Sequence, residues 1–314
     1  MSHPGLRQVE HEITVAAPAD AVYRLIADVQ NWPRIFPPTI HVDHVGKGER
    51  EERIRIWATA NGQAKNWTSR RLLEPEKLRI NFQQEVSAPP VASMGGAWVI
   101  EALSENLSRV RLLHEYRSVG DDPEGLEWID KAVDRNSRSE LGALKVNVEL
   151  AHGSQELTFS FEDTVHIDGS AKDVYDFIND AHLWSQRLPH VATVRLEEDA
   201  PGLQTLEMDT RAKDGSTHTT KSYRVTFPHR SIVYKQVTLP ALMALHTGCW
   251  TFEESEGGVA ATSQHTVVLN TENIARILGA DATVADARQY VQGALSTNSR
   301  ATLDHAKAYA EKTG

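Results

Sequence analysis

The residues best suited to chemistry form a Ser-x-Arg pattern that occurs twice, as Ser69-x-Arg71 and as Ser222-x-Arg224. Each pattern lies in a strand-like run and is followed four residues later by a proline that marks a turn. Because residues two apart in a strand share a face, each serine and its arginine point the same way. If that face looks into a cavity, the pair supplies a hydroxyl and a cation that is costly to bury without a partner or ligand. The alternative is an arginine that is salt-bridged or exposed on the sheet.

The two patterns belong to an internal repeat that covers most of the chain. Trp32 recurs as Trp184 after 152 residues, and His114 recurs as His265 after 151 residues. The Ser-x-Arg patterns themselves lie 153 residues apart. Matches in the same order at a nearly constant spacing predict two similar domains.

The composition bounds the class of protein. A chain of 314 residues is long enough for two domains with their own cores, predicted as 1–151 and 152–314. The net charge of −10 gives no support to nucleic-acid binding, and the single cysteine, Cys249, excludes an intrachain disulfide and a cysteine-based metal site. Without a secretion signal, a membrane-spanning run, a phosphate-binding loop or zinc-ligand spacing, we expect a cytoplasmic protein with no membrane contact and no cofactor.

Both halves show the same order of predicted elements: a strand, a short helix, about six strands and one long helix. Trp32-Pro33 is expected to end the first helix, because a residue before proline avoids the helical region. Strands are expected near 11–16, 40–46, 51–59, 64–73, 77–85, 95–103 and 108–118, and near 157–167, 191–198, 203–212, 217–227, 231–238, 245–254 and 259–269. The long helices are expected at about 124–150 and 283–312.

Strands in series, without helices between them, indicate an antiparallel sheet, so we predict the α+β class. A strongly twisted sheet that curls around one long helix leaves space between the two, and such clefts commonly hold ligands. The long helices carry apolar stripes that Asn136 and Asn298 interrupt. These two residues either line a cavity or bond to the sheet.

The order of elements resembles the helix-grip fold of the Bet v 1 and START-type superfamily. Within it, the chain resembles the polyketide aromatase/cyclases of bacterial type II polyketide synthases. The duplication is similar to that of the two-domain members, and the resemblance covers nearly the whole chain. The residues that carry it are Asp28…Trp32-Pro33…Phe36-Pro37, the Trp67-x-Ser69-x-Arg71 strand, Trp98 and Asn136.

This resemblance implies a substrate, a reaction and partners. The substrate is a reduced poly-β-ketone tethered to an acyl carrier protein, and the reaction is closure of the first six-membered ring with dehydration to an aromatic ring. The ketosynthase and ketoreductase of the same synthase are further implied partners. The resemblance implies no metal or organic cofactor and no nucleic acid.

The site residues follow from the same resemblance. The family's pocket arginine corresponds to Arg71, its serine to Ser69, and its pocket tryptophans to Trp32 and Trp67. In the second half Thr220 replaces the strand tryptophan, which puts the activity of that pocket in doubt. The catalytic candidates are Arg71, Ser69, His114, Arg224 and Ser222, and the substrate-binding candidates are Trp32, Trp67, Phe36, Asn136, Trp184 and Asn298.

The chemistry of the implied reaction gives these residues their expected roles. Ring closure and dehydration pass through enolates, so a cationic donor that faces the developing oxyanion lowers the barrier. Arg71 suits this role but does not release protons usefully, so we expect Ser69 and a bound water to relay them. His114 is the best titratable candidate for a general acid or base.

Three functions stay open at the level of sequence. One is the aromatase/cyclase, one is a carrier that binds an apolar small molecule without catalysis, and one is a scaffold in which one half only docks other synthase components. A carrier needs a largely apolar cavity, so arginine and serine on the cavity face favour the enzyme. Some of these residues could have no part in catalysis or binding. The histidines could be exposed or simply hydrogen-bonded within the fold, and the tryptophans could belong to the core, as we expect for Trp98 and Trp250.

Overall fold

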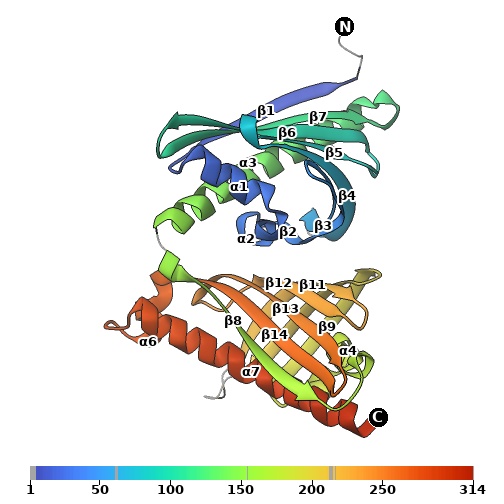
Figure 1. The fold of residues 1–314 in the computed structure, drawn as a ribbon, viewed down its shortest axis with the longest axis vertical. Coiled ribbons are helices and arrows are strands. Elements are labelled where there is room, and N and C mark those ends of the chain that lie inside the picture. Colours follow the sequence, from blue (N-terminus) through green and yellow to red (C-terminus); the bar gives the residue numbers. More distant parts are fainter. Residues whose placement is uncertain (1–4, 61–62, 154, 212–214, 216, 314) are drawn as a thin grey trace. The chain divides into compact units, whose positions relative to one another are not determined.

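The computed structural model describes residues 5–60, 63–153, 155–211, 215 and 217–313 (Figure 1). The chain divides into two compact units, residues 1–155 and 156–314, which we call the N-terminal and the C-terminal domain. The last turn of the long helix of the N-terminal domain runs through the boundary expected at residue 151. Each domain repeats the same series of elements, and we describe each by itself.

The N-terminal domain begins with one strand and two short helices and ends with one long helix. Its helices are α1 (Ala19–Ala27), α2 (Trp32–Ile35) and α3 (Pro123–Gly153). Its strands are β1 (Arg7–Val15), β2 (Thr39–Lys47), β3 (Glu51–Ala60), β4 (Gln63–Glu74), β5 (Arg79–Gln84), β6 (Val91–Ser104) and β7 (Leu107–Ser118).

The C-terminal domain repeats this series, with one additional short helix that was not predicted. Its helices are α4 (Ala171–Asn179), α5 (Trp184–Arg187), the additional α6 (Ile274–Leu278) and α7 (Val284–Thr313). Its strands are β8 (Thr158–Ile167), β9 (Val191–Ala200), β10 (Leu203–Arg211), β11 (Thr217–Phe227), β12 (Ser231–Thr238), β13 (Met243–Ser255) and β14 (Gly258–Leu269).

Each domain contains one antiparallel sheet of seven strands. The strand orders are β1-β7-β6-β5-β4-β3-β2 and β8-β14-β13-β12-β11-β10-β9, so the first strand of each domain pairs with the last. All other neighbours follow each other along the chain. The predicted α+β fold with two tandem domains is confirmed, and the predicted strands are present with bounds that differ by a few residues.

The long helix closes one face of each sheet. Helix α3 contacts β1 and β7, and α7 contacts β8 and β14, as Figure 1 shows within each domain. Residues that recur every three or four positions form the buried stripe of each helix. In α3 these are Ile129, Val133, Ser137, Leu141, Leu144 and Val148, and in α7 they are Ala287, Val291, Ser299, Thr302, Leu303, Ala306 and Ala310.

The stripe expected along α7 was Val284, Ala287, Tyr290, Val291, Ala294, Asn298, Ala301 and His305. It was right at Ala287 and Val291, which are buried, and wrong at Tyr290, which is 57% exposed, and at Ala294, which is exposed as well. Toward the end of the helix the buried face is formed by Ser299 and Thr302, one position beyond the expected Asn298 and Ala301. Because successive residues of a helix are about 100° apart, an error of one position turns a stripe toward solvent.

The role predicted for Trp32-Pro33 was also wrong. Helix α1 ends earlier, at Ala27, and Trp32-Pro33 begins α2, with the proline in its first turn. Proline is accepted there, because the first turn of a helix does not use its N–H groups. Trp184 begins α5 in the same way. Both tryptophans are thereby fixed just after the first helix of their domain.

No helix in the described part of the chain is both long enough and apolar enough to cross a bilayer.

Candidate active site

A buried arginine is bound to the end of the first helix in each domain. Arg71 on β4 donates from Nη2 to the carbonyl oxygens of Ile26 (3.3 Å) and Ala27 (3.0 Å), in the last turn of α1. Arg224 on β11 donates from Nη2 to the carbonyl oxygen of Ile178 (2.9 Å), in the last turn of α4. These carbonyl groups have no partner within their own helix and lie at the negative end of its dipole, so they attract a cation.

The same arginines lie against tryptophan rings. Cζ of Arg71 is 5.1 Å from the ring centroid of Trp32, and Cζ of Arg224 is 5.5 Å from that of Trp184. Only 2% of Arg71 and 3% of Arg224 is exposed. Burial lowers the pKa of each guanidinium to about 10, which leaves both charged at neutral pH. The structure thus brings the predicted arginine and tryptophan together in both domains.

The two arginines differ in their charged neighbours. Nη1 of Arg71 lies 3.2 Å from Oε1 of the buried Glu52. The repeat places Gln204 at the position of Glu52, 152 residues later. Within the described residues, Arg224 makes no ion pair and its buried Nη1 has no hydrogen-bond partner, although Glu198 acts on it at longer range. Among the described residues of the C-terminal domain, no carboxylate contacts and neutralises this cation.

The C-terminal domain contains a partly open cavity of about 120 Å³. Thr220, which replaces the strand tryptophan of the first half, lines it and so leaves room where a larger ring would stand. Side chains from the sheet and from α7 face each other across it. The predicted site residues that line it are Trp184, Ser222, Arg224 and Asn298, and its apolar walls include Leu206, Met208, Trp250 and Leu295.

Polar side chains of this cavity form a hydrogen-bonded cluster. Nδ1 of His265 on β14 lies 2.9 Å from Nε2 of His246 on β13 and 3.0 Å from the hydroxyl of Tyr234 on β12. Nε2 of His265 lies 2.7 Å from Oγ of Ser299 on α7. Burial lowers the pKa of His265 to about 4 and that of His246 to about 3, so both rings are uncharged at neutral pH.

In the N-terminal domain, two predicted site residues serve the packing and a third bonds to the backbone. Phe36 is buried between Trp32 (ring centroids 5.4 Å apart) and Trp98 (5.6 Å). Trp67 packs against the buried side chains of β2 and β3. Ser69 shares the buried face with Arg71, as predicted, and its hydroxyl donates to the carbonyl oxygen of Gln83 (3.1 Å).

The two polar candidates at α3 and β7 differ in their surroundings. Asn136 is exposed and lies one residue away from the buried stripe, where Ser137 takes its place. His114 packs edge-on against Phe82, with ring centroids 5.5 Å apart. Its buried Nδ1 has no hydrogen-bond partner in the described part of the domain. Burial, with a smaller effect of His11, lowers the pKa of His114 to about 4.

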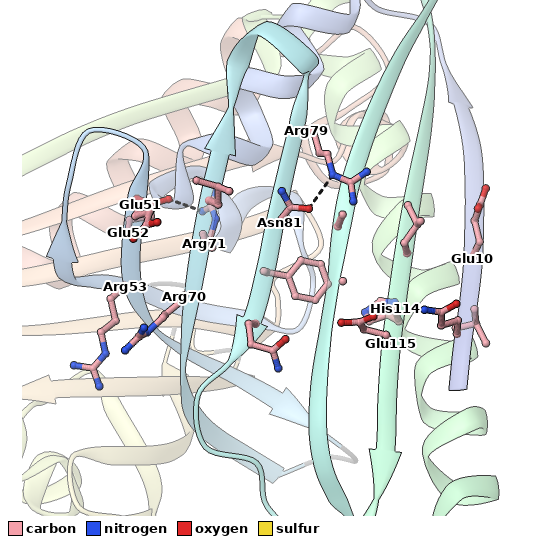
Figure 2. Close-up of a pocket in the computed structure, with 18 of the residues that line it drawn as sticks. Glu10, Glu51, Glu52, Arg53, Arg70, Arg71, Arg79, Asn81, His114 and Glu115 are labelled. Atoms are coloured by element: carbon pink, nitrogen blue, oxygen red, sulfur yellow. Dashed lines mark hydrogen bonds and ion pairs between the residues drawn. The ribbon is translucent and has the colours of Figure 1, made fainter. Parts of the chain in front are cut away.

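Figure 2 shows a wider groove of about 970 Å³ on the sheet of the N-terminal domain. Arg70 and Arg71 both border it but point to opposite faces of β4, since 75% of the Arg70 side chain and 1% of the Arg71 side chain is exposed. Arg53 and Arg70 both pair with Glu85 at 2.6 Å. These two groove arginines therefore share one carboxylate on the exposed face, away from the buried guanidinium.

Glu140 on α3 is a titratable residue that the sequence reasoning missed. The repeat spacing of the long helices, 162 residues, places Thr302 at its position, and Thr302 lines the C-terminal cavity. The Glu140 side chain is partly buried, and this burial raises its pKa to about 7. The signal in the sequence was its place on α3, one turn beyond Asn136 and next to the buried Leu141.

Comparison with known proteins covers both domains. Residues 7–149 and 158–311 each match the family model described as polyketide cyclase / dehydrase and lipid transport. The granaticin polyketide synthase bifunctional cyclase/dehydratase of Streptomyces virginiae is 59% identical over 300 residues, which cover 94% of this chain and 97% of that protein. The actinorhodin polyketide synthase bifunctional cyclase/dehydratase of Streptomyces coelicolor is 44% identical over 320 residues and covers 99% of both.

Two crystal structures match nearly the whole chain. The di-domain ARO/CYC BexL from the BE-7585A biosynthetic pathway has a TM-score of 0.92 and 67% sequence identity. The di-domain ARO/CYC StfQ from the steffimycin biosynthetic pathway has a TM-score of 0.88 and 33% identity. Each match covers 97% of this chain and 99% of the other. The likeness therefore extends over both domains.

The raised pKa of Glu140 predicts a pH-dependent cost in stability. A carboxyl whose pKa is higher in the folded than in the unfolded protein stabilises the fold at low pH, and this contribution is lost as the pH rises to about 7. Glu140→Gln removes the loss, so we expect the variant to gain up to about 3 kcal/mol over the wild type at pH 8 and little at pH 4.5. Urea unfolding at both pH values measures the difference.

The matched control for this prediction is Glu127→Gln on the same helix. Glu127 is exposed and pairs with Lys131 at 2.7 Å, and this pairing lowers its pKa. Its replacement should bring no gain in stability at pH 8. A Glu140→Gln variant that is less stable than the wild type at pH 8 would contradict the assignment of a buried, proton-binding carboxyl.

Proposed function

The chain belongs to the polyketide cyclase/dehydrase and lipid transport family, and from this premise we propose that it is an aromatase/cyclase of aromatic polyketide biosynthesis. It acts on a reduced poly-β-ketone, closes the first six-membered ring and removes water until that ring is aromatic. The observation that carries this proposal is the match over the whole chain to bifunctional cyclase/dehydratases and to di-domain ARO/CYC structures.

The reaction requires a bent chain and a stabilised enolate. Enclosing walls hold the chain in one conformation, which turns ring closure into a reaction between groups already in place. A fixed cation that faces a carbonyl oxygen stabilises the charge that develops there, an effect of about 3–4 kcal/mol for one donor. The buried arginines supply such a cation in each domain, because they cannot lose their charge at neutral pH.

We assign the working cation to Arg224. Its Nη1 is buried without a hydrogen-bond partner among the described residues, and it lines the C-terminal cavity together with Ser222 and Trp184. The charge of Arg71 is instead balanced by Glu52 at 3.2 Å. An ion-paired guanidinium attracts an enolate less than an unpaired one, since the carboxylate repels the same negative charge.

Arg71 keeps a supporting role in this proposal. Its contacts with Ile26, Ala27 and Trp32 fix the end of α1 against the sheet. Ser69 lies two residues before Arg71 on the same face of β4, and His114 lies on β7, three strands away in the sheet.

The substrate is presented by the synthase. The relatives are named as components of polyketide synthases, which supports a chain delivered by an acyl carrier protein. The ketosynthase that builds the chain and the ketoreductase that reduces it are the further partners of this proposal. A carrier of apolar molecules is less well supported, because Arg224, His246 and His265 place a cation and two imidazoles in a cavity whose other walls are mostly apolar.

Replacing each arginine in turn by glutamine shows which domain carries out the reaction. We expect Arg224→Gln to lower the yield of product with an aromatic first ring by about 10²-fold or more, as removal of an oxyanion donor does. Arg71→Gln should lower the thermal stability of the protein and affect the product less. The measurement is product analysis of a reconstituted minimal synthase with ketoreductase, with and without each variant.

Thermal unfolding of each variant is the control, because both arginines also hold a helix end. A stable Arg224→Gln protein that gives the normal product, combined with loss of product in Arg71→Gln, would move the reaction to the N-terminal domain. A wild-type protein that leaves the product profile unchanged would overturn the enzyme itself and favour the carrier.

A further inference from the structure

The C-terminal cavity contains a polar cluster that its twin domain lacks. Tyr234, His246, His265 and Ser299 come from three adjacent strands and from α7, and all four line the cavity. The repeat places Phe82, Met94, His114 and Ser137 at the same positions in the N-terminal domain. The N-terminal domain thus serves as an internal control: it has the same fold, but apolar side chains stand at two of the four positions, those of Tyr234 and His246.

The cluster is buried and costly to maintain. Only 3% of His246, 3% of His265 and 4% of Ser299 is exposed. Buried polar groups that are bound to one another rigidify a site, whereas an apolar packing of the same shape is often equally stable. The N-terminal domain shows that the fold accepts the apolar packing. A polar cluster in the C-terminal domain alone therefore indicates a function of that cavity.

The hydrogen-bond partners determine which nitrogen of each histidine in the cluster carries a hydrogen. Nδ1 of His246 lies 3.0 Å from Oε1 of Gln236, which only accepts, so Nδ1 carries the hydrogen and Nε2 of His246 accepts. His265 then donates from Nδ1, toward His246 and toward the hydroxyl oxygen of Tyr234. Its Nε2 is left as an acceptor and receives the hydroxyl hydrogen of Ser299. Oγ of the buried Ser263 lies 3.1 Å from the same nitrogen and donates to Oγ of Ser299 (3.3 Å), which leaves the Ser299 hydrogen directed at His265.

We infer that Ser299, His265 and Tyr234 form a proton relay in the C-terminal cavity, which carries the proton lost in dehydration to the departing hydroxyl group. This inference rests on the proposed aromatase/cyclase function and names the residues that perform its dehydration step. His246, held by Gln236, is a positioning residue that keeps His265 in the tautomer with Nδ1 protonated. The relay begins at Ser299 on α7 and ends at Tyr234 on β12.

Atoms and electrons balance along this path. The C–H bond α to the carbonyl breaks, and its electron pair forms the new C=C bond as the C–O bond at the β carbon breaks. The proton passes to Oγ of Ser299, whose own hydrogen moves to Nε2 of His265. The Nδ1 hydrogen of His265 moves to Tyr234, whose hydroxyl hydrogen leaves with the departing oxygen as water. The protein keeps its number of protons, and only the tautomer of His265 changes.

The other charged and titratable groups around the cluster are compatible with this relay. Arg224 lines the same cavity and polarises the substrate carbonyl. Asp163 on β8 acts on His265 at a distance and is itself bound by Arg300 (2.7 Å) and Ser296 (2.8 Å) on α7. His190 lines the cavity outside the cluster. No carboxylate in the described part of this domain contacts His265, so a neutral relay is the arrangement that the contacts favour.

The test replaces relay residues by those of the twin domain or by a shape mimic. Tyr234→Phe gives this position the side chain that its counterpart Phe82 has in the N-terminal domain. His265→Asn keeps a short polar side chain. In the reconstituted synthase, we expect both variants to slow dehydration by about 10²-fold or more and to accumulate the cyclised alcohol. His166→Asn, which changes an exposed histidine on β8, should retain the wild-type rate.

The outcomes separate this relay from the proposed function. A wild-type protein that forms the aromatic ring, together with Tyr234→Phe and His265→Asn variants that dehydrate at wild-type rates, overturns the relay alone. A wild-type protein without effect on the products overturns the proposed function first. Thermal unfolding excludes variants that do not fold.

A second measurement does not depend on activity. In the full-length protein labelled with ¹⁵N at histidine, we expect His246 and His265 to be neutral, with the hydrogen on Nδ1, from pH 8 down to pH 5.5. His246→Met, which introduces the residue at Met94, should release His265 to the Nε2-protonated tautomer. Titration of either ring near pH 6.5, or a His265 tautomer that the variant does not change, would overturn the assigned direction.

Discussion

The structure of each domain depends on one buried guanidinium bound to the open end of a short helix. A buried cation is costly, and three kinds of contact offset the cost here: helix-end carbonyl groups, an aromatic face and, in the N-terminal domain, a carboxylate. Arg71 and Arg224 thereby join the sheet to α1 and α4. The same contacts hold Trp32 and Trp184 beside the interior. One interaction thus connects the first helix, the sheet and a tryptophan at the domain interior in each half of the chain.

The two domains share this arginine–helix interaction but differ in the residues around it. Glu52 balances Arg71, whereas the neutral Gln204 leaves Arg224 without a contacting carboxylate. Tyr234 and His246 replace an aromatic and a sulfur-containing side chain of the first half, and they convert apolar packing into a directed hydrogen-bonded cluster. The first domain therefore has the more apolar interior, while the second combines a cation that makes no ion pair within the described residues with neutral proton carriers in one cavity.

Much of the fold could be predicted from the sequence, because alternating strands, proline-marked turns and a repeat are local or periodic signals. That Ser69 and Arg71 share one face followed from strand alternation, but that this face is the buried one did not. The ionic state of Arg71 could not be predicted, since Glu52 meets it only through the register of β3 with β4. His246 and Tyr234 were missed for the same reason: their contacts with His265 join three strands, and no short-range pattern links them.

The central claim is that the uncompensated charge of Arg224 distinguishes the active cavity from its twin. Gln204→Glu tests it most directly, because it places a carboxylate at the position from which Glu52 meets Arg71; Glu198→Gln is combined with it, since Nε2 of Gln204 donates to Glu198 (3.1 Å) and two carboxylates would otherwise meet there. The measurement is the rate of first-ring aromatisation by the folded variant in a reconstituted synthase. We predict a loss of about 10-fold or more, the effect of roughly 1.4 kcal/mol of lost stabilisation of the enolate. A variant that forms the aromatic ring at the wild-type rate would contradict the account.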